Sequence, residues 1–117
     1  MDIKWHGGLC FSIKGKETKI TIDPYADSNH NLKSVKSDII LCTDNYDEKK
    51  KLVDGAEDAE VINWPGEYEI KGTAIIAIPA YTTEKEEGNT EKGRIILHSF
   101  TVDDICICHL GMFGEQL

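Results

Sequence analysis

Apolar and polar residues alternate with a period of two over most of the chain, and this pattern predicts β-strands. Glycine, proline, asparagine and aspartate separate the alternating runs and predict the turns between them. One helix is expected from about Asp47 to Val53, ended by Gly55. A loop or a weak helix is expected over 25–36, and an exposed loop over 82–92. The predicted strands cover residues 1–5, 9–13, 18–22, 38–43, 59–63, 67–71, 73–79, 94–102 and 105–110.

The run from Ser37 to Lys51 occupies the centre of this pattern. Its apolar part, residues 38–43, has the length and the Ile-Ile-Leu content of a buried strand, and it ends at Asp44 and further polar residues. The predicted helix lies between this strand and the one over 59–63, so the two strands are expected to pair in parallel. Polar residues at the end of such a strand are candidates for chemistry, because α/β proteins bind ligands there.

Length and composition narrow the class of protein. The 117 residues fit one domain, 1–117, and 40% hydrophobic with 29% charged residues are typical of a globular protein. No apolar run approaches the roughly 20 residues of a membrane span, and the first residues lack a secretion signal, so a cytoplasmic location is predicted. The net charge of -8 argues against a nucleic-acid partner.

The cysteines and histidines do not follow a metal-binding spacing. Cys10, Cys42, Cys106 and Cys108 lie in apolar strand-like runs without a Cys-x-x-Cys pair, which favours buried free thiols over a zinc knuckle or disulfides. Four histidines match no zinc pattern, and those in or beside strands are expected to be hydrogen-bonded within the sheets. These residues are His6, His30, His98 and His109.

Several segments in order resemble the N-terminal half of metallo-β-lactamase-fold hydrolases, in the lactonase-like branch. They are WHGGLCFSIKG, KITIDPY, SDIILCTDNYDE, NWPGEYEIKG, IPAYTTEKEEGN and ICICHLG. The resemblance covers nearly the whole chain. It implies a β-rich α/β fold, half of an αββα sandwich, with a mixed sheet and one or two helices.

The same resemblance implies a metal site whose ligands are replaced in this chain. The family motif T-H-x-H-x-D-H holds one or two zinc ions, which activate a water molecule. Thr43 matches the threonine, and the histidine of the opening hairpin falls on Gly8. The three histidines of the motif fall on Asp44, Tyr46 and Lys49, its aspartate falls on Glu48, and two later ligands fall on Thr82 and Met112.

The predicted function is that of a non-catalytic member of the family. Without the histidines the fold would be kept and the hydrolytic centre lost, so no cofactor is expected. Asp44, Asp47 and Glu48 favour a solvated helix cap over a Ca²⁺ or Mg²⁺ site. Half a sandwich leaves an apolar sheet face and an open edge, which predicts self-association of two copies. A sheet that curls around its own core, leaving a monomer, is the alternative for assembly.

Two other functions remain open from the sequence. The first is a metal-dependent hydrolase of the lactone or phosphoester type, using zinc or another divalent metal held by Asp44, Glu48 and His109 with residues of a partner chain. The second is a small ligand-binding or structural β-protein of another lineage. The substrate of either protein is not predicted.

Overall fold

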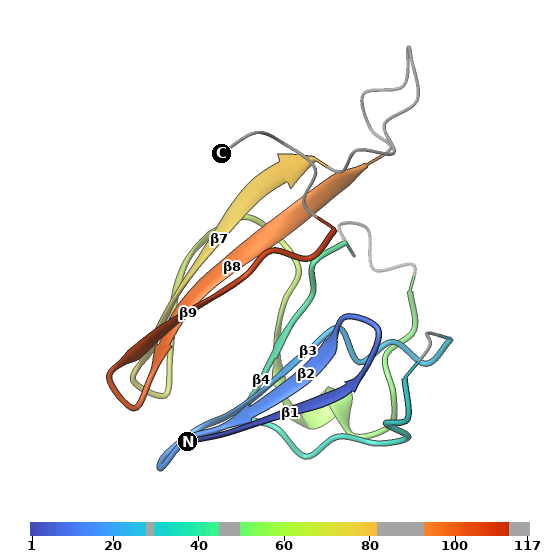
Figure 1. Ribbon diagram of the computed structural model, residues 1–117, viewed down its shortest axis with the longest axis horizontal. Helices are drawn as coiled ribbons and strands as arrows, with labels where there is room; N and C mark the ends of the chain where they lie inside the picture. Colours follow the sequence, from blue (N-terminus) through green and yellow to red (C-terminus); the bar gives the residue numbers. More distant parts are fainter. Residues whose placement is uncertain (28–29, 45–49, 82–92, 113–117) are drawn as a thin grey trace.

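The computed structural model describes residues 1–27, 30–44, 50–81 and 93–112. Figure 1 shows two β-sheets, with β7 to β9 (yellow to red) lying over the sheet that holds β1 to β4. The first sheet has the order β1-β2-β3-β4-β5, with β1 at Asp2–Gly7, β2 at Cys10–Lys14, β3 at Lys19–Ile22, β4 at Ile39–Leu41 and β5 at Glu60–Ile62. The second has the order β6-β7-β8-β9, with β6 at Gly66–Ile70, β7 at Thr73–Tyr81, β8 at Arg94–Val102 and β9 at Ile105–His109.

The first sheet is mixed. β1, β2 and β3 pair in antiparallel fashion, and β4 pairs in parallel with β3 on one side and with β5 on the other. The parallel pair expected from the sequence is therefore confirmed. All three residues of β4 are fully buried, as expected for a central parallel strand covered on both faces.

The expected helix over 47–53 is wrong in its last residues, while residues 45–49 lie outside the described part of the chain. Within the described ranges, residues 50–53 form no helix, and the one helical element is the 3₁₀ turn η1 at Ala56–Asp58. The backbone of residues 51–53 is bonded to the segment after β3 instead. The N–H of Ala26 donates to the Lys51 carbonyl (2.8 Å), and the N–H of Val53 donates to the Pro24 carbonyl (2.9 Å).

The second sheet is an antiparallel meander. The β6–β7 and β8–β9 connections are tight turns. Lys71 and Gly72, between β6 and β7, have positive φ angles of 50° and 79°. Asp103 and Asp104, between β8 and β9, have φ angles of 49° and 65°. Two positive φ angles in a two-residue loop match the twist of antiparallel strands, so the hairpin expected at Asp103-Asp104 is confirmed.

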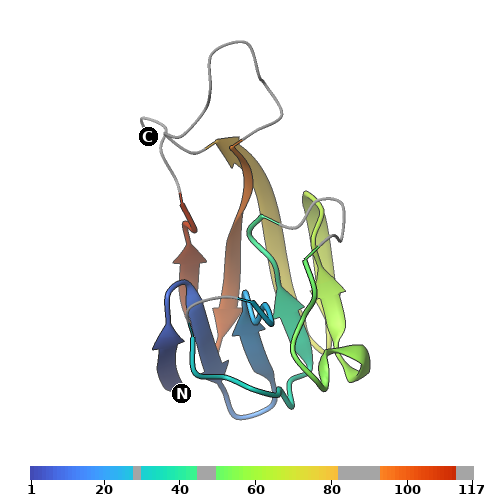
Figure 2. The same cartoon turned by 90° about the vertical axis from the view of Figure 1, so that its right-hand side faces the viewer.

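The main hydrophobic core lies between the two sheets. Alternation along each strand turns one set of apolar side chains toward the other sheet. Figure 2 shows the strands of both sheets running in a similar direction, as in an aligned sandwich. The chain therefore buries a core of its own, and the expected half-sandwich fold is confirmed. The buried core residues are Ile13, Ile20, Ile22, Ile39, Leu41, Ile62, Ile75, Ala77, Ile96, Phe100 and Val102.

The prediction that all four cysteines are buried is wrong for two of them. All four are free thiols, but only Cys10 and Cys42 are buried, while Cys106 and Cys108 are exposed on β9. β9 is the last strand of its sheet, and its alternate residue Ile107 packs against the core instead. No helix in the described ranges is long and apolar enough to cross a membrane.

Candidate functional site

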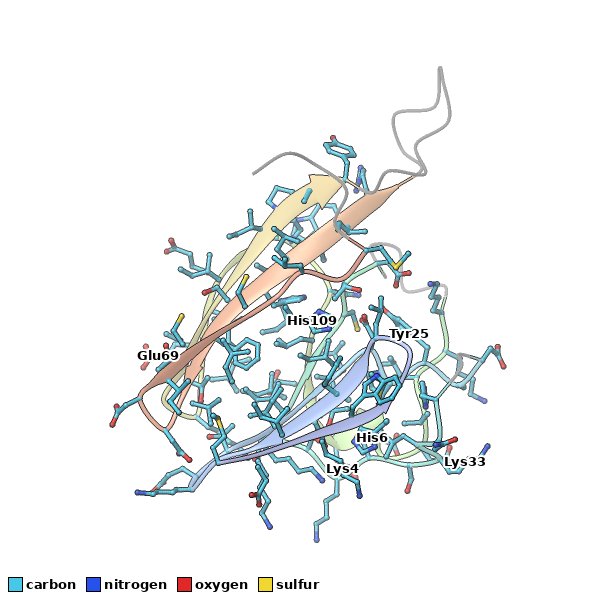
Figure 3. The ribbon with its side chains drawn as sticks, viewed as in Figure 1. Lys4, His6, Tyr25, Lys33, Glu69 and His109 are labelled. Atoms are coloured by element: carbon cyan, nitrogen blue, oxygen red, sulfur yellow. The ribbon has the colours of Figure 1, made fainter. Side chains whose placement is uncertain are left out.

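A cavity of about 250 Å³ opens where β3 and β4 end, beside the turn between β1 and β2. Strands β3 and β4 are parallel, so their carboxyl ends meet at one edge of the sheet. Figure 3 shows Tyr25, which follows β3, beside this turn. The cavity thus lies at the place where the sequence predicted chemistry. Its lining residues are Gly7, Gly8, Leu9, Cys10, Asp23, Tyr25, His30, Asp44 and Lys50.

Asp23 is a buried carboxylate that holds the end of β4. Its Oδ1 accepts a hydrogen bond from the Thr43 backbone N–H (2.7 Å), and its Oδ2 accepts one from the Thr43 hydroxyl (2.6 Å). Only 3% of Asp23 and 1% of Thr43 is exposed. Burial raises the pKa of Asp23 to about 6, although the two bonds from Thr43 act in the opposite direction. Asp23 therefore has a structural role, since both of its oxygens are engaged.

Lys50 and Asp44 form an ion pair at the exposed rim of the cavity, where their side chains are 50% and 34% exposed. The Lys50 ammonium contacts Asp44 Oδ2 and also lies 5.0 Å from the centre of the Tyr25 ring, a cation–π distance. The buried Tyr25 hydroxyl lies beside the carboxylates of Asp23 and Asp44, which are its hydrogen-bond acceptors. Burial raises the pKa of this hydroxyl far above its ordinary value, and the charge of Asp23 adds to the effect. Tyr25 therefore stays a neutral hydroxyl next to the two carboxylates of the cavity.

Directly after β4 the backbone forms hydrogen bonds with the second sheet. The N–H of Ile96 donates to the Thr43 carbonyl (2.6 Å), and His98 Nε2 lies 2.8 Å from the Cys42 carbonyl oxygen. Because a carbonyl only accepts, His98 must carry its proton on Nε2. The ring is fully buried, and burial lowers the pKa of His98 to about 4. The prediction of a hydrogen-bonded sheet histidine is confirmed here.

The nitrogens of two other histidines are also engaged in local bonds. His30 lines the cavity, but its Nε2 bonds to the Tyr25 carbonyl (2.6 Å), and its Nδ1 accepts from the Leu32 N–H (3.1 Å). His6, on β1, has its Nε2 2.8 Å from the Ser12 hydroxyl on β2. His30 therefore has no free nitrogen to offer a ligand in the cavity.

His109 lies apart from Asp44. It lines a second, apolar cavity of about 230 Å³ between the sheets, and its ring packs edge to face on Phe11 (5.7 Å between centroids). Its Nδ1 accepts a hydrogen bond from the Gly111 N–H (3.2 Å). Burial lowers the pKa of His109. Asp44 and His109, two of the three weak metal candidates, line different cavities.

The remaining motif positions divide into packed and exposed residues. Gly111 has φ +57°, and a side chain there would begin 3.1 Å from Thr43 Cβ, so the glycine allows β9 to end against β4. Met112, which the family resemblance aligns with an aspartate ligand, is 51% exposed. Gly8 has φ 54° in the turn between β1 and β2. The third weak metal candidate, Glu48, and the motif positions Tyr46, Lys49 and Thr82 lie outside the described ranges.

The described residues at the cavity do not fit a catalytic zinc ion. Structural and catalytic zinc sites use three or four histidine, cysteine or carboxylate ligands, and the described ranges contain no group of three such residues. Asp44 is paired with the Lys50 ammonium. Burial raises the pKa of Cys10 to about 11, which keeps it a thiol and therefore a poor metal ligand.

Sequence reasoning identified Thr43 and Asp44 at this site but missed Asp23, Tyr25 and Lys50. A usable signal was present, since Asp23 directly follows the predicted strand over 18–22. Parallel pairing with the strand over 38–43 would have placed the ends of both strands together. Lys50 had no comparable signal, because it belongs to a run of three lysines that was assigned to a helix.

Comparisons with known proteins identify the family and the fold. A family model described as a beta-lactamase superfamily domain matches residues 2–117. The chain is similar to the UPF0173 metal-dependent hydrolase TV0864 of Thermoplasma volcanium, at 34% identity over 115 residues, 88% of this chain and 51% of that protein. It is also similar to the UPF0173 protein PYRAB01190 of Pyrococcus abyssi, at 44% identity over 66 residues, 53% of this chain and 30% of that protein.

A solved structure shows the same fold. The crystal structure of a metallo-beta-lactamase superfamily protein from Thermotoga maritima matches with a TM-score of 0.70 at 23% identity. The match covers 98% of this chain and 51% of the other. This chain therefore spans about half the length of that protein and half or less of the curated relatives that it matches.

Proposed function

Because this chain belongs to the beta-lactamase superfamily, we propose that it is a member that keeps the family framework, holds no catalytic metal and acts by associating with another protein chain, first of all a second copy of itself. The observation that carries the proposal is the ion pair between Asp44 and Lys50. Asp44 occupies the first histidine position of the family motif, so the ammonium that contacts it stands close to where a metal would bind.

The charge of Lys50 opposes metal binding directly. A divalent cation about 4 Å from an ammonium would be repelled by several kcal/mol even in the moderately polar environment of a protein surface. Displacing the ammonium would break the contact with Asp44 and the stacking on Tyr25. Neither His30, with both nitrogens engaged, nor the Cys10 thiol would compensate for that loss.

The outer face of the second sheet supports association. Ile76 and Ile78 point away from the core on β7 and are 46% and 42% exposed. The exposed thiols of Cys106 and Cys108 lie on the same outer face, across from β8 residues. Exposed apolar residues gathered on one sheet face are typical of protein contacts. The free thiols also fit a reducing compartment such as the cytoplasm.

Metal analysis of the purified protein tests the loss of catalysis. We expect far less than one zinc, iron or manganese ion per chain, and no hydrolysis of a lactone or a phosphodiester before or after incubation with zinc or manganese. The competing function is metal-dependent hydrolysis, which the name of the Thermoplasma volcanium relative suggests. Stoichiometric metal, removed by a chelator together with a hydrolase activity that Asp44→Ala abolishes, would establish that function instead.

Solution mass tests the association. We expect light scattering to give a dimer whose fraction rises with concentration, and Ile76→Lys to shift it to the monomer. Val61→Lys is the matched control, because Val61 is a similarly exposed apolar residue (39%) on the first sheet. A wild-type monomer at all concentrations would contradict self-association and leave only a different protein chain as the partner.

A further inference from the structure

We infer that β9 is a contact strand between two copies of this chain, in which the two β9 strands pair in antiparallel fashion about Ile107 and bring Cys106 of each copy opposite Cys108 of the other. This inference rests on the self-association in the proposed function, and it adds a second contact beside the outer face of the second sheet. Figure 2 shows β9 (red) at one edge of that sheet. Within the described ranges, β9 pairs with β8 alone.

Charge distinguishes β9 from the other edge strands. Of the four edge strands in the described part of the chain, β1 carries an aspartate and a lysine, β5 carries a glutamate, and β6 carries two glutamates. Charged side chains on an edge strand oppose pairing with another chain. The sequence of β9 is Ile-Cys-Ile-Cys-His, and burial lowers the pKa of His109, so the ring stays neutral at pH 7. In a chain with a net charge of -8, β9 is therefore the edge that a second copy can approach.

The turn before β9 determines which backbone groups of the strand face the open edge. Asp103-Asp104 is a two-residue turn, and Val102 pairs with Ile105 on either side of it. Residues that flank such a turn exchange hydrogen bonds with each other, and the bonded side alternates along an antiparallel ladder. The odd-numbered residues of β9 therefore bond to β8. The N–H and C=O groups of Cys106 and Cys108 point to the edge and are available to another strand.

Antiparallel pairing about Ile107 uses all five residues of β9. It sets Ile107 against its own copy on the core side and Cys106 against Cys108 of the other copy on the outer side, where both thiols are exposed. Hydrogen-bonded residues opposite each other have Cα atoms about 5.5 Å apart, within the range that a disulfide spans. Pairing centred on either cysteine would be shorter. The contact is isologous, with two-fold symmetry.

The acidic turn before β9 favours the antiparallel direction. A parallel arrangement would place Asp103 and Asp104 directly beside the same residues of the other copy. In the antiparallel arrangement the two turns lie at opposite ends of the pair, roughly 20 Å apart along the strands. This separation exceeds the Debye length of about 8 Å at physiological ionic strength, so the repulsion between the turns is largely screened.

Thiol cross-linking tests the register, because a contact of five residues buries too little surface for a tight complex in dilute solution. Diamide takes two electrons and two protons from a pair of thiols, so a disulfide forms and diamide is reduced to its hydrazine. The 117-residue chain is oxidised under native conditions as the wild type, Cys106→Ser, Cys108→Ser, an equimolar mixture of these two variants, and the variant with both substitutions. Covalent dimer is measured on non-reducing gels and by mass spectrometry.

The wild type and the mixture should be trapped. In either single variant the remaining exposed thiol lies opposite a serine, whereas a mixed pair sets Cys108 of one chain opposite Cys106 of the other. We expect the mixture to give at least about five times as much covalent dimer as either variant alone. The variant with both substitutions keeps the buried Cys10 and Cys42 and should give none. As much dimer from a single variant as from the mixture, or no dimer from the wild type and the mixture, overturns the inference.

A charge placed on the edge should prevent the trapping. Ile105→Lys introduces a lysine at a 51% exposed position of β9, and Val61→Lys introduces one at a 39% exposed position of β5, which is also an edge strand. Both variants keep Cys106 and Cys108. We expect the yield of covalent dimer to fall about tenfold in Ile105→Lys and to stay within about twofold of the wild type in Val61→Lys. Equal yields in these two variants would overturn the β9 contact.

The results separate this contact from the proposed function. Ile76→Lys alters the outer face and leaves β9 intact, so its trapping should persist. Loss of trapping in Ile76→Lys would show that the thiols meet through the outer face and would overturn the β9 contact. A concentration-dependent dimer that is not trapped also overturns the β9 contact and leaves the proposed function standing. A trapped β9 dimer with stoichiometric metal and hydrolysis overturns the loss of catalysis and leaves the β9 contact standing. A monomer at all concentrations that is not trapped overturns both.

Discussion

The interior between the two sheets and the polar end of β3 and β4 are both buried, but they are stabilised in different ways. The interior contains aliphatic side chains and Phe100, whose packing depends on shape and apolar area. At the polar end, Asp23 and Thr43 satisfy each other, and the buried His98 bonds to a backbone carbonyl. The packing between the sheets therefore depends on side-chain volume, whereas the polar end depends on specific hydrogen-bonded pairs. Each of these pairs can be tested by its own substitution.

The largest effect is expected in the interior. Phe100 is 2% exposed and belongs to the core between the sheets, so Phe100→Ala should lower the free energy of unfolding by about 3–5 kcal/mol. Urea denaturation followed by circular dichroism measures this loss. Ile76→Ala, on the exposed outer face, is the control and should cost less than about 1 kcal/mol. Equal losses in the two variants would contradict the placement of the core.

The next largest effect is expected at the polar end. Asp23→Ala leaves the N–H and the hydroxyl of Thr43 buried without acceptors, so we expect a loss of about 2–4 kcal/mol in urea denaturation. Asp23→Asn keeps one carbonyl acceptor and should lose about half as much. Asp27→Ala, at an exposed position after the same strand, should be neutral. An equal loss for Asp23→Ala and Asp27→Ala would show that the pair with Thr43 is unimportant.

Two buried groups, Asp23 and His98, should contribute to the pH dependence of stability in opposite directions. The raised pKa of Asp23, about 6, means that stability falls as pH rises from about 4 to 6. The lowered pKa of His98, about 4, means that stability rises with pH from about 4 to 6.5. Each effect is on the order of 3 kcal/mol, so the contributions of these two groups largely offset each other in the wild type.

Substitutions should reveal each effect alone. Denaturation between pH 4 and 6.5 should show stability rising with pH in Asp23→Asn, because the lowered pKa values of His98 and His109 both act in that direction. In His98→Gln, the raised pKa of Asp23 acts without the opposing effect of His98, so the slope should shift toward falling stability. Parallel pH profiles in the two variants would refute the opposition of these groups.

Much of the fold could be predicted because alternation and turn chemistry act locally. The parallel pair of β4 with β5 and the hairpin at Asp103-Asp104 follow from short stretches of sequence. The helix failed at residues 50–53 because the backbone there bonds to the segment after β3, a distant partner that local propensity does not include. The exposure of Cys106 and Cys108 was missed because alternation alone does not tell a covered sheet face from an open one.

The site could be predicted only in part, for a related reason. Asp44 follows directly from its strand, but its ion pair with Lys50 depends on how the chain returns to the cavity. The bond from His98 to the Cys42 carbonyl joins residues 56 positions apart, in different sheets. The sequence indicated that His98 would find a partner, but that partner depends on how the two sheets stack.

Gly111 also bears on how sequences of this kind are annotated. Gly111 has a left-handed backbone and lies close to Thr43. The Gly of H-L-G and the Thr of the strand-end motif therefore pack against each other. A search for these motif fragments would therefore retrieve chains that share the backbone arrangement whether or not they catalyse a reaction. Transfer of a hydrolase label should rest on the positions that the family resemblance aligns with metal ligands, such as Asp44 and Met112, because the glycine and the threonine contribute to the fold.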